Sequence, residues 1–116
     1  MDSKEIVEIA ASVAAGKQAS DIVIIDIGNV SIITDYFVIC SGQTNRQVET
    51  IVDSIEERLR GLKVRKIGLE GDRDKSWILL DYGSVVIHVF TQEQREYYRL
   101  ERLWADAPHR KWGETG

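Results

Sequence analysis

Residues 76–90, SWILLDYGSVVIHVF, decide the fold. The aliphatic and β-branched residues predict two strands, and the tetrad DYGS at 81–84 predicts a tight turn between them. Placing Tyr82 and Gly83 in a two-residue loop pairs Trp77 with His88 across the hairpin. A slip of one residue in this register would exchange the two faces of the hairpin.

The two faces of this hairpin differ, because side chains alternate along a strand. One face is aliphatic throughout and carries Ile78, Leu80, Val85, Ile87 and Val89. The other mixes an aromatic ring, aliphatic chains, a carboxylate and an imidazole, and carries Trp77, Leu79, Asp81, Ser84, Val86 and His88. Two interpretations are open: a sheet covered on both sides with internally satisfied polar groups, or a semi-apolar surface that a partner protein covers. Tryptophan is enriched at binding hot spots, so Trp77 is the centre of any such surface.

Apolar periodicity around the hairpin predicts three helices and three more strands. The helices start at caps on Asp2, Thr44 and Thr91; the first runs to about residue 17, the second stops at Gly61, and the third reaches Trp104. The strands are expected at 21–27, 36–41 and 62–69, with a charged loop at 70–75. An α/β (α+β mixed) fold follows, with a mixed sheet of about five strands and flanking helices. Residues 1–104 form the single domain, and 105–116 are expected to be an irregular tail.

Length and composition fit one globular domain with an ordinary balance of residues. The 116 residues carry a net charge of -4, from 15 basic and 19 acidic side chains. This balance argues against general nucleic-acid binding and suits a basic partner. The single cysteine, Cys40, excludes a disulfide within the chain and indicates a reducing compartment. The acidic N-terminus lacks the apolar core of a signal peptide, so a cytoplasmic protein is expected.

Residues for catalysis or metal binding are sparse. Cys40, His88 and His109 lack close ligand spacing, and no base stands beside a marked nucleophile. The turn at 41–46, SGQTNR, follows a strand and precedes a helix, so it is either a phosphate site or an ordinary capped turn. Asp21 and Asp26 are five residues apart and face opposite sides of a strand, so they do not form a metal-binding carboxylate pair. We therefore predict no catalytic residue, metal or cofactor.

Five motifs together resemble the ribosomal silencing factor family, also called the Iojap-like family, over residues 3–104. They are DYFVICSG at 35–42, NRQV at 45–48, GLEG at 68–71, WILLDYGSVVIHVF at 77–90 and YRLERLW at 98–104. The resemblance implies a non-enzymatic translation repressor that binds ribosomal protein fourteen of the large subunit on its intersubunit face. Such a repressor blocks association of the two subunits during starvation. The resemblance also implies a nucleotidyltransferase-like topology without the catalytic carboxylates.

Carried onto this chain, the resemblance assigns partner binding to six residues: Trp77, Leu79, Asp81, Tyr82, His88 and Tyr98. Tyr82 is expected at the turn, where its ring reaches the partner, whereas Tyr98 has packing of the last helix as its alternative. Two other functions stay open: a large-subunit assembly factor with limited ribosomal RNA contact, and a nucleotide-binding or nucleotidyltransferase-like enzyme using the turn at 41–46. An exposed sheet face also allows a homodimer when the protein is free.

Overall fold

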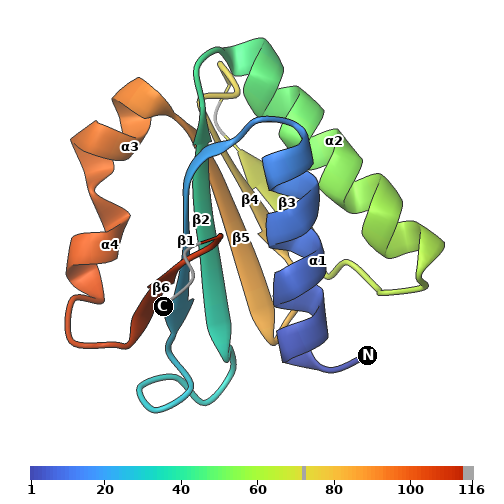
Figure 1. Cartoon of the computed structure of the whole chain (residues 1–116), viewed down its shortest axis with the longest axis vertical. Helices are drawn as coiled ribbons and strands as arrows, with labels where there is room; N and C mark the ends of the chain where they lie inside the picture. The colour runs from blue at the N-terminus through green and yellow to red at the C-terminus, as the bar shows by residue number, and fades with distance from the viewer. Residues whose placement is uncertain (72, 114–116) are drawn as a thin grey trace.

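The computed structural model describes residues 1–71 and 73–113, and a mixed sheet forms its centre (Figure 1). The described part contains six strands in the order β3-β4-β5-β2-β1-β6. Strands β2 and β5 are parallel, and every other neighbouring pair is antiparallel. The strands are β1 (Ser20–Asp26), β2 (Tyr36–Gly42), β3 (Gly68–Gly71), β4 (Trp77–Asp81), β5 (Val85–Thr91) and β6 (His109–Lys111).

Helices lie on both faces of the sheet. On one face are α1 (Ser3–Gly16) and α2 (Asn45–Gly61), and on the other are α3 (Gln92–Tyr98) and α4 (Leu100–Leu103) (Figure 1). The three predicted caps are confirmed: the side chains of Asp2, Thr44 and Thr91 each accept from the backbone N–H three residues on. In the described part of the chain, no helix has the length and apolar character needed to cross a bilayer.

The main core lies between the sheet and the α1–α2 layer. Apolar stripes on both helices meet the aliphatic face of the hairpin, as the alternation in residues 76–90 predicts. The fully buried members include Val48, Ile51, Ile55, Leu59, Leu80, Val85 and Ile87. All seven residues of β5 are buried, so this strand requires cover on both faces.

The hairpin register differs from the expected one by two residues. Trp77 pairs with Phe90, not His88, and the two-residue loop is Gly83-Ser84. Gly83 has φ +83° and donates its N–H to Asp81 Oδ1 at 2.8 Å. Glycine adopts this left-handed backbone without the steric cost that Tyr82 would meet, and this difference moves the loop. A shift of two residues preserves alternation, so the two faces keep their predicted members.

Three other expectations about the elements are corrected. The strand predicted at 62–69 begins only at Gly68 and takes in Glu70 and Gly71, which were expected in a loop, because pairing with β4 decides its bounds. The single last helix is broken at Arg99, whose φ of 46° lies outside the helical region. Each correction reflects tertiary pairing or backbone geometry that helical and strand periodicity do not encode.

The segment from residue 105 onward, expected to be irregular, contributes an edge strand. Residues of β6 pair with β1, and the flanking backbone bonds run from Asp26 N to Pro108 O and from Trp112 N to Ile22 O, both at 2.9 Å. Trp112 packs against the main core. Three exposed polar residues in a row give no alternation, so the strand could not be predicted from its own pattern. Residues 114–116 of the expected tail lie outside the described residues.

A buried arginine joins the second helical layer to the sheet. Arg95 of α3 is 8% exposed. Its Nε donates to Glu101 Oε1 at 2.9 Å, and its Nη1 donates to Ser41 Oγ at 3.2 Å and to the carbonyl oxygen of Asp21. One guanidinium therefore connects α3, α4, β1 and β2, and the buried charge is compensated by Glu101.

Removing this guanidinium should destabilise the fold strongly. We expect Arg95→Met to lower the free energy of unfolding by about 2–3 kcal/mol, since it leaves buried acceptors and Glu101 without their donor. The exposed Arg102 is the matched control, and Arg102→Met should change stability by less than about 0.5 kcal/mol. Urea unfolding of both variants checks the prediction, and equal stabilities would contradict the role given to Arg95.

Candidate functional site

The second face of the sheet is only partly covered by α3 and α4. A smaller core cluster forms where Leu100, Trp104 and Ala107 pack over Val23, Ile25, Ile27, Ile39 and Phe90. Strand β4 lies beyond this cluster, toward the other edge of the sheet. On the same face of β4, Trp77, Leu79 and Asp81 are all half-buried. The mixed face predicted from the sequence is therefore accessible at β4 and covered farther along the sheet.

The accessible part of this face forms a shallow hollow of about 390 Å³. Its lining consists of Glu70, Gly71, Trp77, Leu79 and Tyr98. The Trp77 and Tyr98 rings lie 4.9 Å apart between centroids, and Tyr98 is 48% exposed. We call these five residues the β4 surface. Aromatic and aliphatic groups that are partly exposed around a hollow are the pattern of a protein-docking site.

Trp77 is held in place from beneath by ring contacts and one hydrogen bond. Its ring stacks on Phe90 at 5.1 Å, and its indole Nε1 donates to His88 Nδ1 at 3.2 Å. The Phe37 ring meets the other side of His88 edge-on at 5.0 Å. Because these contacts fix the orientation of the indole, the β4 surface has little ordering left to do on binding.

His88 supports the surface and does not form part of it. Its side chain is buried at 5% exposure, so it can reach a partner only through Trp77. Since Nδ1 accepts a hydrogen bond, Nε2 carries the proton, and within the described residues Nε2 is a buried atom with no partner. Burial lowers the His88 pKa to about 4, so the ring is neutral at pH 7.

Asp81 and Tyr82 have different environments from those expected. The Asp81 carboxylate keeps its place on the mixed face but uses one oxygen to accept from Gly83 N. Tyr82, expected to present its ring at the turn, is 7% exposed and packs in the main core on the opposite face. Burial raises its pKa to about 12. The register shift that places Gly83 in the loop explains this correction, and Tyr82 is not part of the β4 surface.

Sequence reasoning missed the residues that support the surface. Phe90 follows His88 at the strand period of two, so alternation alone could have placed it on this face. Phe37 and Trp104 required the parallel pairing of β2 with β5 and the break at Arg99, which no local pattern shows. Glu70 could not be placed because its strand was expected to end earlier.

Other chemistry has little support in the described residues. They contain no group of three His, Cys, Asp or Glu side chains placed to hold a metal ion. Cys40 is buried, which raises its pKa to about 12 and keeps the thiol protonated. In the turn at 41–46, Gln43 N donates to Gln47 Oε1 at 2.7 Å and Gln47 N donates to Thr44 Oγ1 at 3.0 Å. These amides are occupied by the turn's own side chains, which favours the capped-turn interpretation over a phosphate site.

Comparison with known proteins finds relatives over almost the whole chain. The family model described as "Ribosomal silencing factor during starvation" matches residues 1–115. The ribosomal silencing factor of Bacillus subtilis is 42% identical over 110 residues, which cover 93% of this chain and 92% of that protein. A mouse protein named "Mitochondrial assembly of ribosomal large subunit protein 1" is 35% identical over 101 residues, which cover 84% of this chain and 44% of that protein.

Solved structures share the fold. A crystal structure of a Chromobacterium violaceum protein matches with a TM-score of 0.87 at 30% identity, covering 90% of this chain and 88% of that one. A Bacillus halodurans crystal structure matches with a TM-score of 0.82 at 31% identity, covering 93% and 98%. The expected mixed α/β fold with flanking helices is confirmed, with six strands in the described residues where about five were predicted.

The stability of the protein should depend on pH through His88. Its pKa is about 4 in the folded protein against 6.5 ordinarily. Between these values the unfolded chain binds a proton that the folded protein does not, so the free energy of unfolding falls as the pH drops from about 6.5 to about 4. The loss attributable to His88 is roughly 3 kcal/mol, measured by urea unfolding across this range.

Carboxylates titrate in part of the same range, so the test compares variants. In His88→Asn the amide oxygen can still accept from the Trp77 indole, but the titrating group is gone, and the stability should fall less steeply with pH. His109, the other histidine, is exposed in β6. His109→Gln should therefore follow the wild-type curve. A His88→Asn curve as steep as that of wild type would show that His88 does not cause the dependence.

Proposed function

The chain belongs to the family of ribosomal silencing factors, and we propose that it represses translation by docking its β4 surface on the large ribosomal subunit. The partner we infer is ribosomal protein fourteen, on the intersubunit face. A protein bound there occupies space that the small subunit needs for joining. No bond is made or broken in this mechanism, so we propose a binding protein that acts in the cytoplasm and not an enzyme.

The β4 surface is the observation that carries the proposal. It is the part of the mixed sheet face that α3 and α4 leave accessible, and Trp77 stands at its centre with Leu79 and Tyr98 beside it. Large rings with few rotatable bonds contribute contact area at a low entropic cost, especially when they are already oriented. His88 and Phe90 provide that orientation for Trp77.

Charge supports a basic partner for this surface. Glu70 lines the hollow, and Asp81 lies on the same face of β4. The chain as a whole has a net charge of -4. Acidic groups around an apolar centre speed encounter with a basic protein and align it, while the buried rings supply most of the affinity.

A role in assembly of the large subunit is the second candidate function. The observation that favours it is the mouse relative, whose name describes assembly of the mitochondrial large subunit. The same β4 surface would serve both roles, since each requires binding to the large subunit. They differ in consequence: a silencing factor lowers joining of mature subunits, whereas an assembly factor leaves joining unchanged and its loss leaves immature large subunits.

Substitutions in the β4 surface should abolish binding to the large subunit. We expect Trp77→Ala to weaken binding by about 2 kcal/mol or more, the range of interface hot spots. Because Trp77 also packs on Phe90 and His88, a second variant, Leu79→Lys, changes a half-buried side chain and places a positive charge against the basic partner. Both affinities are measured by co-sedimentation with purified large subunits, after circular dichroism has verified the fold.

Tyr82 provides the matched control. It lies two residues from Asp81 in space and sequence terms close to the surface, yet its ring packs in the core on the opposite face. Tyr82→Phe removes only the hydroxyl and should leave the affinity for large subunits within about twofold of wild type, a change below 0.5 kcal/mol. Wild-type affinity in both Trp77→Ala and Leu79→Lys would exclude the β4 surface as the docking site.

A further inference from the structure

A second hollow lies on the opposite side of α3 and α4 from the β4 surface. It has a volume of about 470 Å³ and opens between the α3–α4 corner and strands β1 and β6. Its floor includes Arg95, whose buried guanidinium is already compensated by Glu101. The hollow therefore begins with a neutral floor, and the charges at its rim decide what it can bind.

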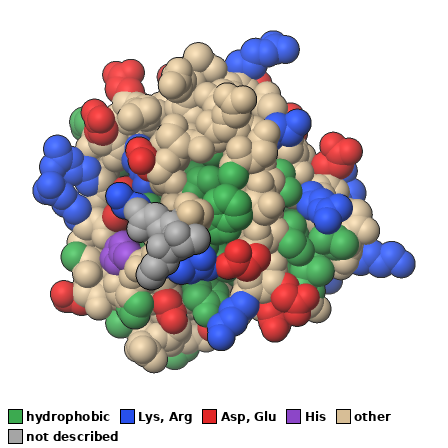
Figure 2. All heavy atoms as spheres, in the orientation of Figure 1, with side chains coloured by type: hydrophobic (Ala, Val, Ile, Leu, Met, Phe, Trp, Pro, Cys, Tyr) green, Lys and Arg blue, Asp and Glu red, His purple; other side chains and the backbone are tan. Residues whose placement is uncertain are grey.

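The rim carries three exposed cations from separate parts of the chain: Arg99, Arg102 and Lys111. Within the described residues, none of them has a carboxylate oxygen within 4.0 Å. Arg99 Nε donates to the Glu96 carbonyl at 3.1 Å, which holds the guanidinium at the corner and leaves its two terminal nitrogens facing outward. Basic side chains gather at the left edge in Figure 2, where Figure 1 places α3 and α4.

Two carboxylates also line this hollow, Asp21 and Glu96, together with the imidazole of His109. The three rim cations exceed them by one charge, in a chain whose net charge is -4. The positive charge is therefore local, and composition alone could not reveal it. The acidic neighbours also weaken anion binding here, which gives the site a testable signature of opposite sign.

We propose that this rim binds the phosphodiester backbone of RNA. Guanidinium and ammonium groups are the usual phosphate ligands, and three of them spread over a corner, a helix and an edge strand suit an extended polyanion better than a single small ion. The inference rests on the proposed function, because RNA backbone lies beside the proteins on the surface of a large subunit. Docking of the β4 surface would leave this rim free to contact it.

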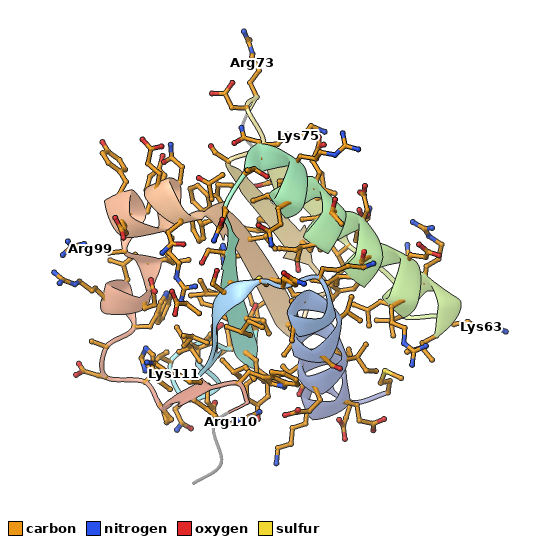
Figure 3. The ribbon with its side chains drawn as sticks, turned by 45° about the horizontal axis from the view of Figure 1, so that its top comes forward. Lys63, Arg73, Lys75, Arg99, Arg110 and Lys111 are labelled. Atoms are coloured by element: carbon orange, nitrogen blue, oxygen red, sulfur yellow. The ribbon has the colours of Figure 1, made fainter. Side chains whose placement is uncertain are left out.

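The direct test is a nuclear magnetic resonance titration of the full chain with a 16-base-pair RNA duplex at low salt. We expect the side-chain Nε–H resonances of Arg99 and Arg102 and the amides of β6 to shift, while those of Arg58 and Lys63 stay in place. Arg58 and Lys63 are exposed cations at the end of α2, and Figure 3 shows Lys63 far from Arg99 and Lys111. No shift at Arg99 and Arg102, or equal shifts at every exposed cation, would overturn the proposal.

Charge variants test the same site through its salt dependence. Replacing Arg99, Arg102 and Lys111 together by glutamine should reduce the slope of log affinity against log salt for the RNA by about 2. The matched triple variant at Arg58, Lys63 and Arg65 should keep the wild-type slope, and Glu96→Gln should tighten binding. An unchanged slope in the first variant would contradict the proposal. If wild type fails to bind large subunits, the proposed function falls, but the RNA titration still decides this inference by itself.

Discussion

The structure depends on a central strand, β5, whose residues are buried on both faces. It pairs in parallel with β2 and in antiparallel with β4, so it needs an apolar layer above and below. The layer of α1 and α2 covers one face completely. The layer of α3 and α4 is shorter and covers the other face only as far as β5, which leaves the side chains of β4 accessible beside a well-packed core. A partner protein would complete this second layer.

The accessible surface is organised from inside the protein. Trp77 is stacked on Phe90 and hydrogen-bonded to His88, and His88 is wedged against Phe37. Burying the Nε2–H of His88 without a partner in the described residues costs on the order of 1–3 kcal/mol. The compensation is a neutral ring that accepts from the indole and holds it in one orientation, and an oriented tryptophan loses less entropy on binding. Arg95 plays the corresponding part on the other side of α3, where its buried charge fixes the helix to the sheet.

Residues 76–90 predicted the hairpin and its two unlike faces, because alternation survives a register error of two residues. The three helix caps were also local signals and could be predicted. The turn at Gly83, the break at Arg99 and strand β6 could not, since they depend on backbone conformation and on pairing between distant segments. For the same reason Tyr82 was assigned to the wrong face, and Phe37 was missed. The placement of Trp77 and Leu79 on one accessible surface needed only alternation, whereas the support from Phe37 and Trp104 needed the whole topology.

The central claim is that occupancy of the β4 surface and joining of the two ribosomal subunits exclude each other. The most direct measurement titrates the protein into purified large and small subunits and follows, by sedimentation, both its occupancy on large subunits and the fraction of joined ribosomes. The account predicts that the joined fraction falls in step with occupancy and that joined ribosomes carry no bound protein. Joined ribosomes that retain the protein would contradict it and would favour the assembly role.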